Sequence, residues 1–155
     1  MQALYQGSRS RAEELLPPDA ELNVFEAAAF GRLDRLAEIL DADPAQANAS
    51  SPDGFTPLHL ACFSGGAGAT TLLVERGAEL ETISRAKVAQ VRPLGTAAFS
   101  GDVESARVLL DAGADPNGAA EGGGTPLETA QANRNEELVE LLRAYGADAG
   151  SAGVG

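Results

Sequence analysis

The chain has 155 residues, a net charge of −12 and one cysteine, Cys62. A single cysteine excludes an intramolecular disulfide, and the acidic charge argues against nucleic acid, because affinity for phosphate backbones comes mainly from Lys and Arg. No apolar run reaches the roughly 20 residues of a membrane-spanning helix, and the first residues lack the pattern of a signal peptide. We therefore expect a soluble, cytoplasmic protein that binds neither nucleic acid nor membrane.

The first predicted elements are two degenerate helix pairs. Residues 1–18 form a short pair around Gly7, and Pro17-Pro18 turns the chain directly into the next unit. Residues 19–50 form a second pair, whose apolar stripe ends at Asp43-Pro44. We expect the first pair to be an N-terminal cap that lacks a finger, the loop that joins one pair to the next.

Three fuller units follow, over residues 51–84, 85–118 and 119–148, and the last is the predicted C-terminal cap. Each has a short alanine-rich helix, then a helix with paired leucines that a glycine ends. The glycines repeat at regular spacing: Gly77 to Gly113 is 36 residues, and Gly113 to Gly146 is 33. Residues 149–155 are a predicted flexible tail.

The opening phrase of these units identifies their type. Thr56-Pro57-Leu58-His59-Leu60-Ala61 opens the first, and Thr125-Pro126-Leu127 opens the last. Threonine caps a helix and proline suits its first position, whereas Arg92 replaces the threonine in the middle unit and removes a cap worth about 1 kcal/mol. A period near 33 residues with a T-P-L-H-x-A opening is the ankyrin signature. Over about residues 1–148 the chain resembles an ankyrin-repeat protein.

The resemblance implies an all-α repeat solenoid, a stack of helix-turn-helix units with short β-hairpin fingers, in a single domain over residues 1–148. Ankyrin proteins are typically binding scaffolds, which use the finger tips and the exposed side of the first helices as a concave surface. The resemblance implies no catalysis and no cofactor. We expect a monomer that binds a protein or a peptide.

Aromatic residues recur at one position of the aligned units, just before the glycine between the two helices: Tyr5, Phe30, Phe63 and Phe99. In the ankyrin layout this position faces the concave groove, and Phe55 and Val91 share a second exposed position before the helix. The rings either pack on one another or form a strip of anchors for a partner. Exposure of several rings favours binding, and burial of all of them excludes it.

The finger within Glu81–Arg92 is about three residues longer than its counterpart and carries three bases: Arg85, Lys87 and Arg92. These side chains are either solvated and loosely paired with acidic neighbours, or they contact an acidic partner.

A catalytic pair is the third possibility for this chain. His59 and Cys62 are three residues apart on a predicted helix, so they share a face and could form a thiolate and imidazole pair. The ankyrin resemblance instead implies that His59 hydrogen-bonds to the backbone of a finger and that Cys62 is a buried, inert thiol. One His and one Cys also fall short of a zinc site. We predict no catalytic, cofactor or metal site.

The sequence thus predicts a non-catalytic protein–protein interaction module. The alternative is a regulatory or inhibitory subunit of an enzyme encoded nearby. The enzyme hypothesis predicts turnover that is lost in His59→Ala or Cys62→Ala while folding survives. Ten of the eleven basic residues are Arg, and Ala and Gly are abundant, which predicts a GC-rich bacterial genome.

Overall fold

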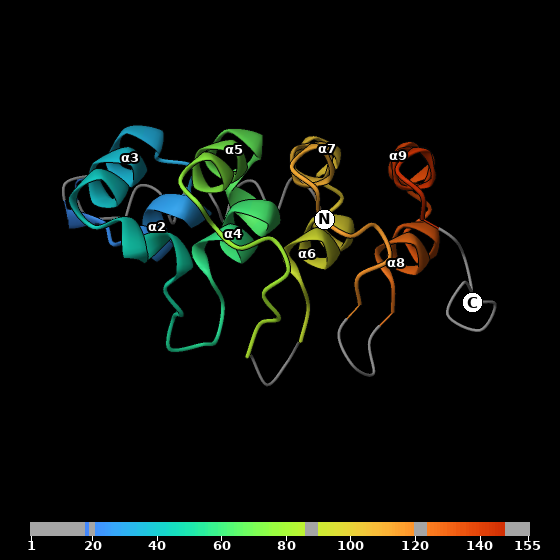
Figure 1. Ribbon diagram of the computed structural model, residues 1–155, viewed down its shortest axis with the longest axis horizontal. Helices are drawn as coiled ribbons and strands as arrows, with labels where there is room; N and C mark the ends of the chain where they lie inside the picture. Colours follow the sequence, from blue (N-terminus) through green and yellow to red (C-terminus); the bar gives the residue numbers. More distant parts are fainter. Residues whose placement is uncertain (1–17, 19–20, 86–89, 120–123, 148–155) are drawn as a thin grey trace.

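The computed structural model describes residues 18, 21–85, 90–119 and 124–147, and these residues form four helix pairs in a row (Figure 1). Residues 1–17 of the predicted cap and the predicted tail lie outside the described residues. The all-α repeat solenoid is confirmed. The boundaries of the individual repeats stay predictions.

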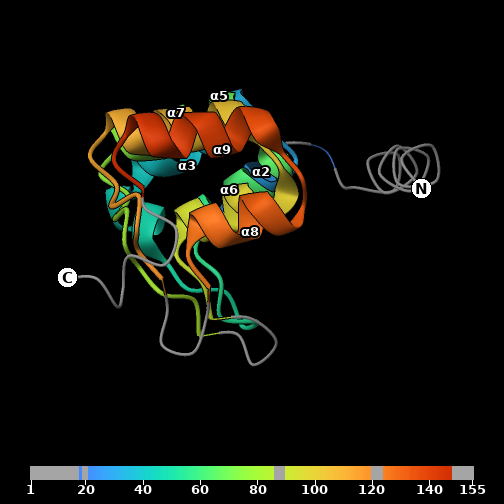
Figure 2. The ribbon, with the colours of Figure 1, turned by 90° about the vertical axis from the view of Figure 1, so that its right-hand side faces the viewer.

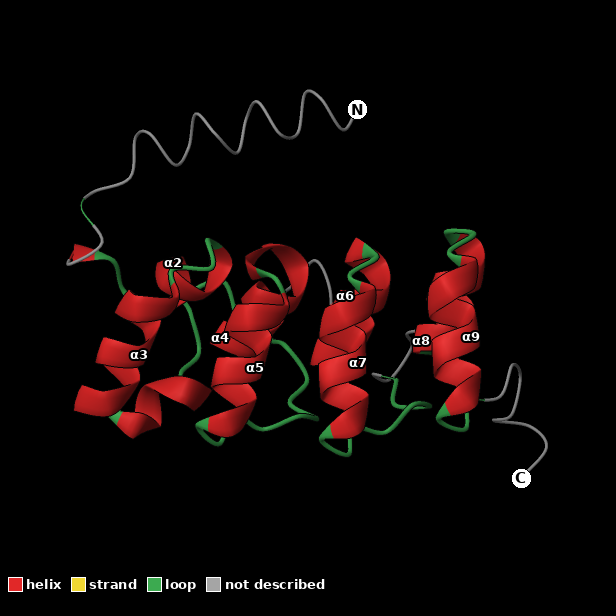
Figure 3. Ribbon diagram, turned by 90° about the horizontal axis from the view of Figure 1, so that it is seen from above, coloured by secondary structure: helices red, strands yellow, loops and turns green. Residues whose placement is uncertain are grey.

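The helices form two layers, which Figure 2 shows in a view along the stack. The first helices of the pairs lie nearer the fingers: α2 (Val24–Ala29), α4 (Pro57–Leu60), α6 (Pro93–Ser100) and α8 (Pro126–Ala132). The second helices lie side by side in the other layer (Figure 3): α3 (Leu33–Ala42), α5 (Ala67–Glu75), α7 (Val103–Asp111) and α9 (Glu136–Ala144). Two short turns complete the row: the 3-10 helix η2 (Pro44–Asn48) and the π-helical turn η3 (Ala61–Gly65).

The core repeats with the sequence. Leu58, Leu94 and Leu127 follow the first proline of α4, α6 and α8, and each is fully buried or nearly so. Small residues allow the first helices to stack closely, as at Gly65, where an added Cβ would lie 1.9 Å from the carbonyl oxygen of Ala28. Only a residue without a side chain fits there.

The helix caps match their sequence signals. Thr56 accepts the amide of His59 at 3.3 Å, and Thr125 accepts the amide of Glu128 at 3.1 Å. Helix α6 has no side-chain cap, because Arg92 stands at that position. The predicted loss of this cap is therefore confirmed.

The fingers differ in detail from the predicted β-hairpins, because the described residues contain no strand. Backbone bonds close the described parts of two fingers: the amide of Ser51 donates to Phe55 at 2.8 Å, and that of Ser84 donates to Val91 at 2.9 Å. A strand needs a succession of such pairs. The described parts of the fingers project from the layer of first helices (Figure 1).

Candidate partner-binding site

A pocket of about 240 Å³ lies where η3, α6 and α8 meet the fingers. Five of the residues singled out in the sequence line it: Phe55, Phe63, Val91, Arg92 and Phe99. They come from two neighbouring units and from the finger between them. Folding therefore brings together residues that are up to 44 positions apart, from Phe55 to Phe99.

Two aromatic rings form the exposed edge of this pocket. Phe63 is 47% exposed and Phe99 is 66% exposed. The rings are stacked, with centroids 6.4 Å apart and an angle of 16° between their planes. Each ring thus packs on the other and still presents surface to solvent. The packing of the rings on one another and the exposure expected of partner anchors therefore occur together.

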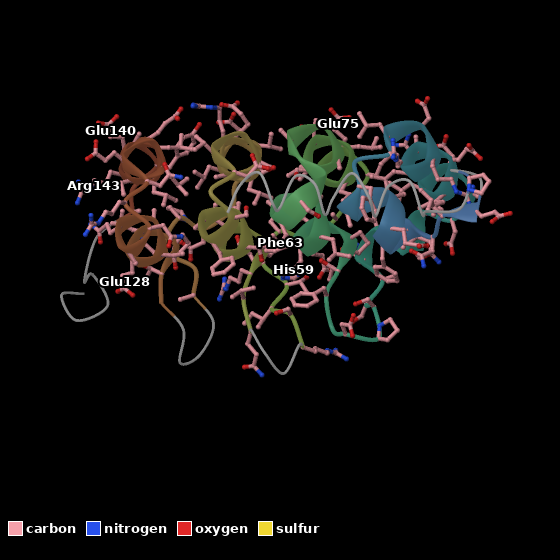
Figure 4. All side chains as sticks on the ribbon, turned by 180° about the vertical axis from the view of Figure 1, so that it is seen from behind. His59, Phe63, Glu75, Glu128, Glu140 and Arg143 are labelled. Carbon is pink, nitrogen blue, oxygen red and sulfur yellow. The ribbon has the colours of Figure 1, made fainter. Side chains whose placement is uncertain are left out.

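The position of Phe63 depends on a π-helical turn. The amide of Gly66 donates to the carbonyl of Ala61 at 2.9 Å, which widens the end of the first helix by one residue. The hydroxyl of Ser64 donates to the carbonyl of Ala29 in the preceding unit at 2.7 Å and holds the turn in place. Figure 4 shows Phe63 on the finger side of the helix layers, close to His59.

Similar hydrogen bonds between neighbouring units lie beside the aromatic position of the next unit, Phe99. The hydroxyl of Ser100, directly after Phe99, donates to the carbonyl of Cys62 at 2.8 Å. The side-chain amide of Asn133 donates to the carbonyl of Phe99 at 3.4 Å. Because each bond joins neighbouring units beside the aromatic position, the spacing of the rings is fixed by the stack.

His59 does not line the pocket but hydrogen-bonds to Val91, which does. Its Nδ1 accepts the amide of Thr56 at 3.3 Å, so Nε2 carries the proton and donates to the carbonyl of Val91 at 2.8 Å. Its ring also meets that of Phe55 edge to face, with centroids 6.1 Å apart. Burial lowers the pKa of His59, against the opposing effect of its backbone hydrogen bonds with Val91 and Thr82. The imidazole is therefore a neutral clamp on the finger.

Arg92 forms another wall. Its Nη1 pairs with Oε1 of Glu81 at 3.2 Å, and Oε2 of the same carboxylate accepts the amide of Asp115 in the next finger at 2.8 Å. The side chain lies against Gly118, where an added Cβ would be 3.1 Å from Cδ of Arg92. Arg92 is half-buried and pairs with its acidic neighbour Glu81, as in the first sequence alternative, and its contact with an acidic partner stays a prediction.

The other predicted site residues are not brought into the pocket. Phe30 follows the last residue of α2, is half-buried and does not line it. Arg85 is exposed, and its amide donates to the carbonyl of Gly54 at 2.8 Å, beside the Phe55 end of the pocket. Tyr5 and Lys87 lie outside the described residues.

The sequence reasoning missed seven lining residues: Gln90, Gly95, Thr96, Gly118, Ala119, Gly124 and Thr129. Two of them had a readable signal, because Gly95 and Thr96 precede Phe99 by four and three residues and so share its helix face. The loop residues Gly118, Ala119 and Gly124 had none, since their place depends on how the next finger packs.

The proposed catalytic pair has no support in the geometry. Cys62 is fully buried, and its burial raises the pKa of the thiol to about 12, so the thiol stays protonated. Both nitrogens of the His59 ring are engaged with Thr56 and Val91. In the described part of the chain, no three His, Cys, Asp or Glu side chains are grouped as metal ligands. No helix in that part is long and apolar enough to cross a membrane.

Comparison with known proteins identifies the repeat. The family model "Ankyrin repeats (3 copies)" matches residues 24–120. A probable E3 ubiquitin-protein ligase of Oryza sativa subsp. japonica, XBOS31, is 36% identical over 96 residues, which are 61% of this chain and 21% of the relative. "Ankyrin repeat and SAM domain-containing protein 6" of Rattus norvegicus is 33% identical over 132 residues, which are 84% and 14% of the two chains.

A fungal protein, "Ankyrin repeat protein nuc-2" of Neurospora crassa, is 33% identical over 129 residues, which are 79% of this chain and 11% of the relative. This chain therefore spans 11% to 21% of the length of these three relatives. All three are eukaryotic, so the predicted bacterial source gains no support from them. Because the family model covers more than half of the chain, the chain belongs to the ankyrin-repeat family, whose domains generally mediate protein–protein interactions.

Proposed function

We propose that this chain is a non-catalytic interaction module that holds a protein or peptide partner between its first helices and its fingers. The observation that carries the proposal is the pocket of about 240 Å³ at the exposed rings of Phe63 and Phe99. Aromatic side chains in a partly enclosed apolar site are typical anchors of binding surfaces.

The build of the site supports binding over simple packing. Phe99 is 66% exposed, so most of its ring gains nothing from the core, although exposed aromatic surface is unfavourable in water. Around it, hydrogen bonds from Ser100, Asn133 and His59 hold the backbone in one arrangement. A rigid site loses little conformational entropy when a partner binds.

The long finger adds charge selection to this proposal. Arg85 is exposed beside the Phe55 end of the pocket, so it is available to an acidic group of the partner. We also propose that the chain works as a monomer in a reducing, cytoplasmic setting, which its single, fully buried cysteine suits.

A pull-down from native lysate tests the function. The bait is the full chain, beside a Phe63→Ser/Phe99→Ser double variant and a Leu33→Ser control. Leu33 is a suitable control because it is 44% exposed on α3, in the other helix layer. We expect partners that the wild type and the control retain and the double variant loses, with all three melting at similar temperatures. A partner retained equally by all three refutes the groove assignment, and a double variant that unfolds supports the packing alternative.

A further inference from the structure

We propose that the pocket receives one large, uncharged apolar side chain from a partner segment, and that Lys or Arg residues next to this anchor lie toward α8. This inference rests on the proposed function of the groove and adds the chemistry of the partner. It follows from three properties of the site: the volume of the pocket, the pairing of the lining residue Arg92 with Glu81, and the negative charge at the edge of the pocket near α8.

The size of the pocket fits a single side chain. Its volume of about 240 Å³ is below the roughly 300 Å³ at which pockets for whole small molecules begin. It exceeds the roughly 150 Å³ of an apolar cavity that binds a benzene ring. One aromatic or branched aliphatic side chain therefore fills it, while the rest of the segment lies outside.

The wall of the pocket selects an uncharged anchor. The rings of Phe55, Phe63 and Phe99 make most of the lining apolar. Among the described lining residues Arg92 is the only charged one, and its guanidinium is already paired with Glu81 at 3.2 Å. A Lys or Arg in the pocket would be repelled by Arg92, and an Asp or Glu would have to lose its hydration and compete with Glu81.

The rim toward α8 is acidic. An added Cβ at the lining residue Gly124 would lie 2.9 Å from Oε2 of Glu128, so this carboxylate borders the pocket. Glu128 is exposed and its neighbour Thr129 is a lining residue. The described part of the last unit carries four glutamates and two arginines: Glu128, Glu136, Glu137, Glu140, Arg134 and Arg143.

A basic segment therefore has favourable electrostatics on this side of the anchor. The carboxylate of Glu128 acts at contact range, and the net charge of −12 attracts cationic segments from further away. An acidic segment at the same place would face like charge from Glu128 and from the whole unit. On the α8 side the described residues thus favour an apolar anchor with basic neighbours, whereas Arg85 at the Phe55 end stays available to an acidic group.

Selection from a random library of 12-residue peptides, displayed against the 155-residue chain, tests this inference. Enriched peptides are then made with a fluorescein label and titrated by fluorescence anisotropy. We expect enriched peptides to share one Leu, Ile, Met, Phe or Trp with Lys or Arg within three positions. Replacement of that anchor by Ala should weaken binding at least tenfold, as for other buried interface anchors.

Variants of the chain locate the two contacts. Phe99→Ala should weaken binding at least tenfold without unfolding, because the ring is 66% exposed. Glu128→Gln should weaken it about two- to fivefold, and less at high salt, as for an exposed ion pair. Gln keeps the helix cap at this position, since the side chain only has to accept the amide of Thr125. Glu140→Gln removes the same charge from α9 in the other layer (Figure 4) and should weaken binding less than Glu128→Gln.

The outcomes separate this inference from the function on which it rests. If binding depends on Phe99 while the peptides lack basic neighbours, or Glu128→Gln has no more effect than Glu140→Gln, the partner chemistry is wrong and the groove assignment stands. If the common anchor is charged, the size and polarity argument is wrong. If no peptide is enriched, or binding ignores Phe99→Ala, both the inference and the proposed groove fail.

Discussion

Arg92 pairs with Glu81 at 3.2 Å across the base of one finger, and this contact takes the place of a helix cap. In the neighbouring units a threonine holds the start of the helix, as Thr56 and Thr125 do. Here the residue at the same position, Arg92, lines the pocket. Its partner Glu81 also accepts the amide of Asp115 in the next finger. A local stabilising interaction has been exchanged for one that joins two fingers.

Arg92→Thr should therefore separate stability from pocket structure. The new cap contributes about 1 kcal/mol, and the lost, partly exposed ion pair removes up to about 1 kcal/mol, so the free energy of unfolding should change little. Glu81 would lose its partner, and amide exchange at Asp115 should become faster. Urea unfolding and hydrogen exchange measure the two effects. A large loss of stability with unchanged exchange at Asp115 would contradict this account.

The buried imidazole predicts a pH dependence of stability. Burial lowers the pKa of His59 in the folded state, so below its ordinary value of about 6.5 the unfolded chain binds the proton more readily. The folded state should lose up to about 1.4 kcal/mol per pH unit relative to His59→Gln as the pH falls from 6.5 toward the lowered pKa. Urea unfolding of both proteins between pH 7.5 and 5.5 measures this difference, and parallel curves would show that His59 does not titrate as described.

His59→Gln should also be less stable at pH 7.5, where both side chains are neutral. It would lose the hydrogen bonds that join Thr56 to the finger carbonyl of Val91, at a cost of about 1 to 3 kcal/mol. Since Val91 lines the pocket, the variant should also bind the selected peptides more weakly. Unchanged peptide affinity would mean that the finger keeps its position without the clamp.

Cys62 should be unreactive in the folded protein. Its side chain is fully buried and the pKa of its thiol is raised to about 12, so at pH 8 almost no thiolate is present or accessible. Reaction with a chromogenic disulfide reagent should be slow in buffer and fast in urea. Rapid labelling of the native chain would reopen the hypothesis of a reactive cysteine.

Gly65→Ala should destabilise the stack between the first two described units. The added Cβ would lie 1.9 Å from the carbonyl oxygen of Ala28, so backbone has to shift to admit it. We expect a loss of about 1 to 3 kcal/mol or more in the free energy of unfolding. Gly68→Ala is the matched control, because its Cβ would meet only the end of the Leu33 side chain, at 3.2 Å. Equal stability of the two variants would contradict the close packing at Gly65.

Gly95→Ala should have opposite effects on stability and binding. The position lies in α6, where Ala is better than Gly by about 0.5 to 1 kcal/mol, and the new Cβ would make an ordinary contact of 3.6 Å with Val91. The same methyl group would occupy part of the pocket. We expect a higher melting temperature and weaker binding of the selected peptides. A stabilised variant with full affinity would show that the anchor does not reach Gly95.

The regular features of this protein were readable because they are local. The spacing of Gly77, Gly113 and Gly146 gives the period, and Thr56 and Thr125 mark helix starts through bonds to residues three positions on. The cap signals lie within one turn and the period is a spacing along the chain, so the fold class could be predicted without knowledge of the packing.

The site depended on contacts between units, which the sequence alone did not determine. The sequence placed Phe30, Phe63 and Phe99 just before the glycine between the two helices, with Phe30 one residue nearer to it, and only the latter two stack and line a pocket. The difference arises from the π-helical turn at Phe63, from the pairing of Arg92 with Glu81 and from the approach of Gly118 in the next finger. The sequence by itself determined a stack of ankyrin units and their order. Only the tertiary structure decided where neighbouring units enclose a pocket, because its walls come from side chains and backbone that meet only when the units stack.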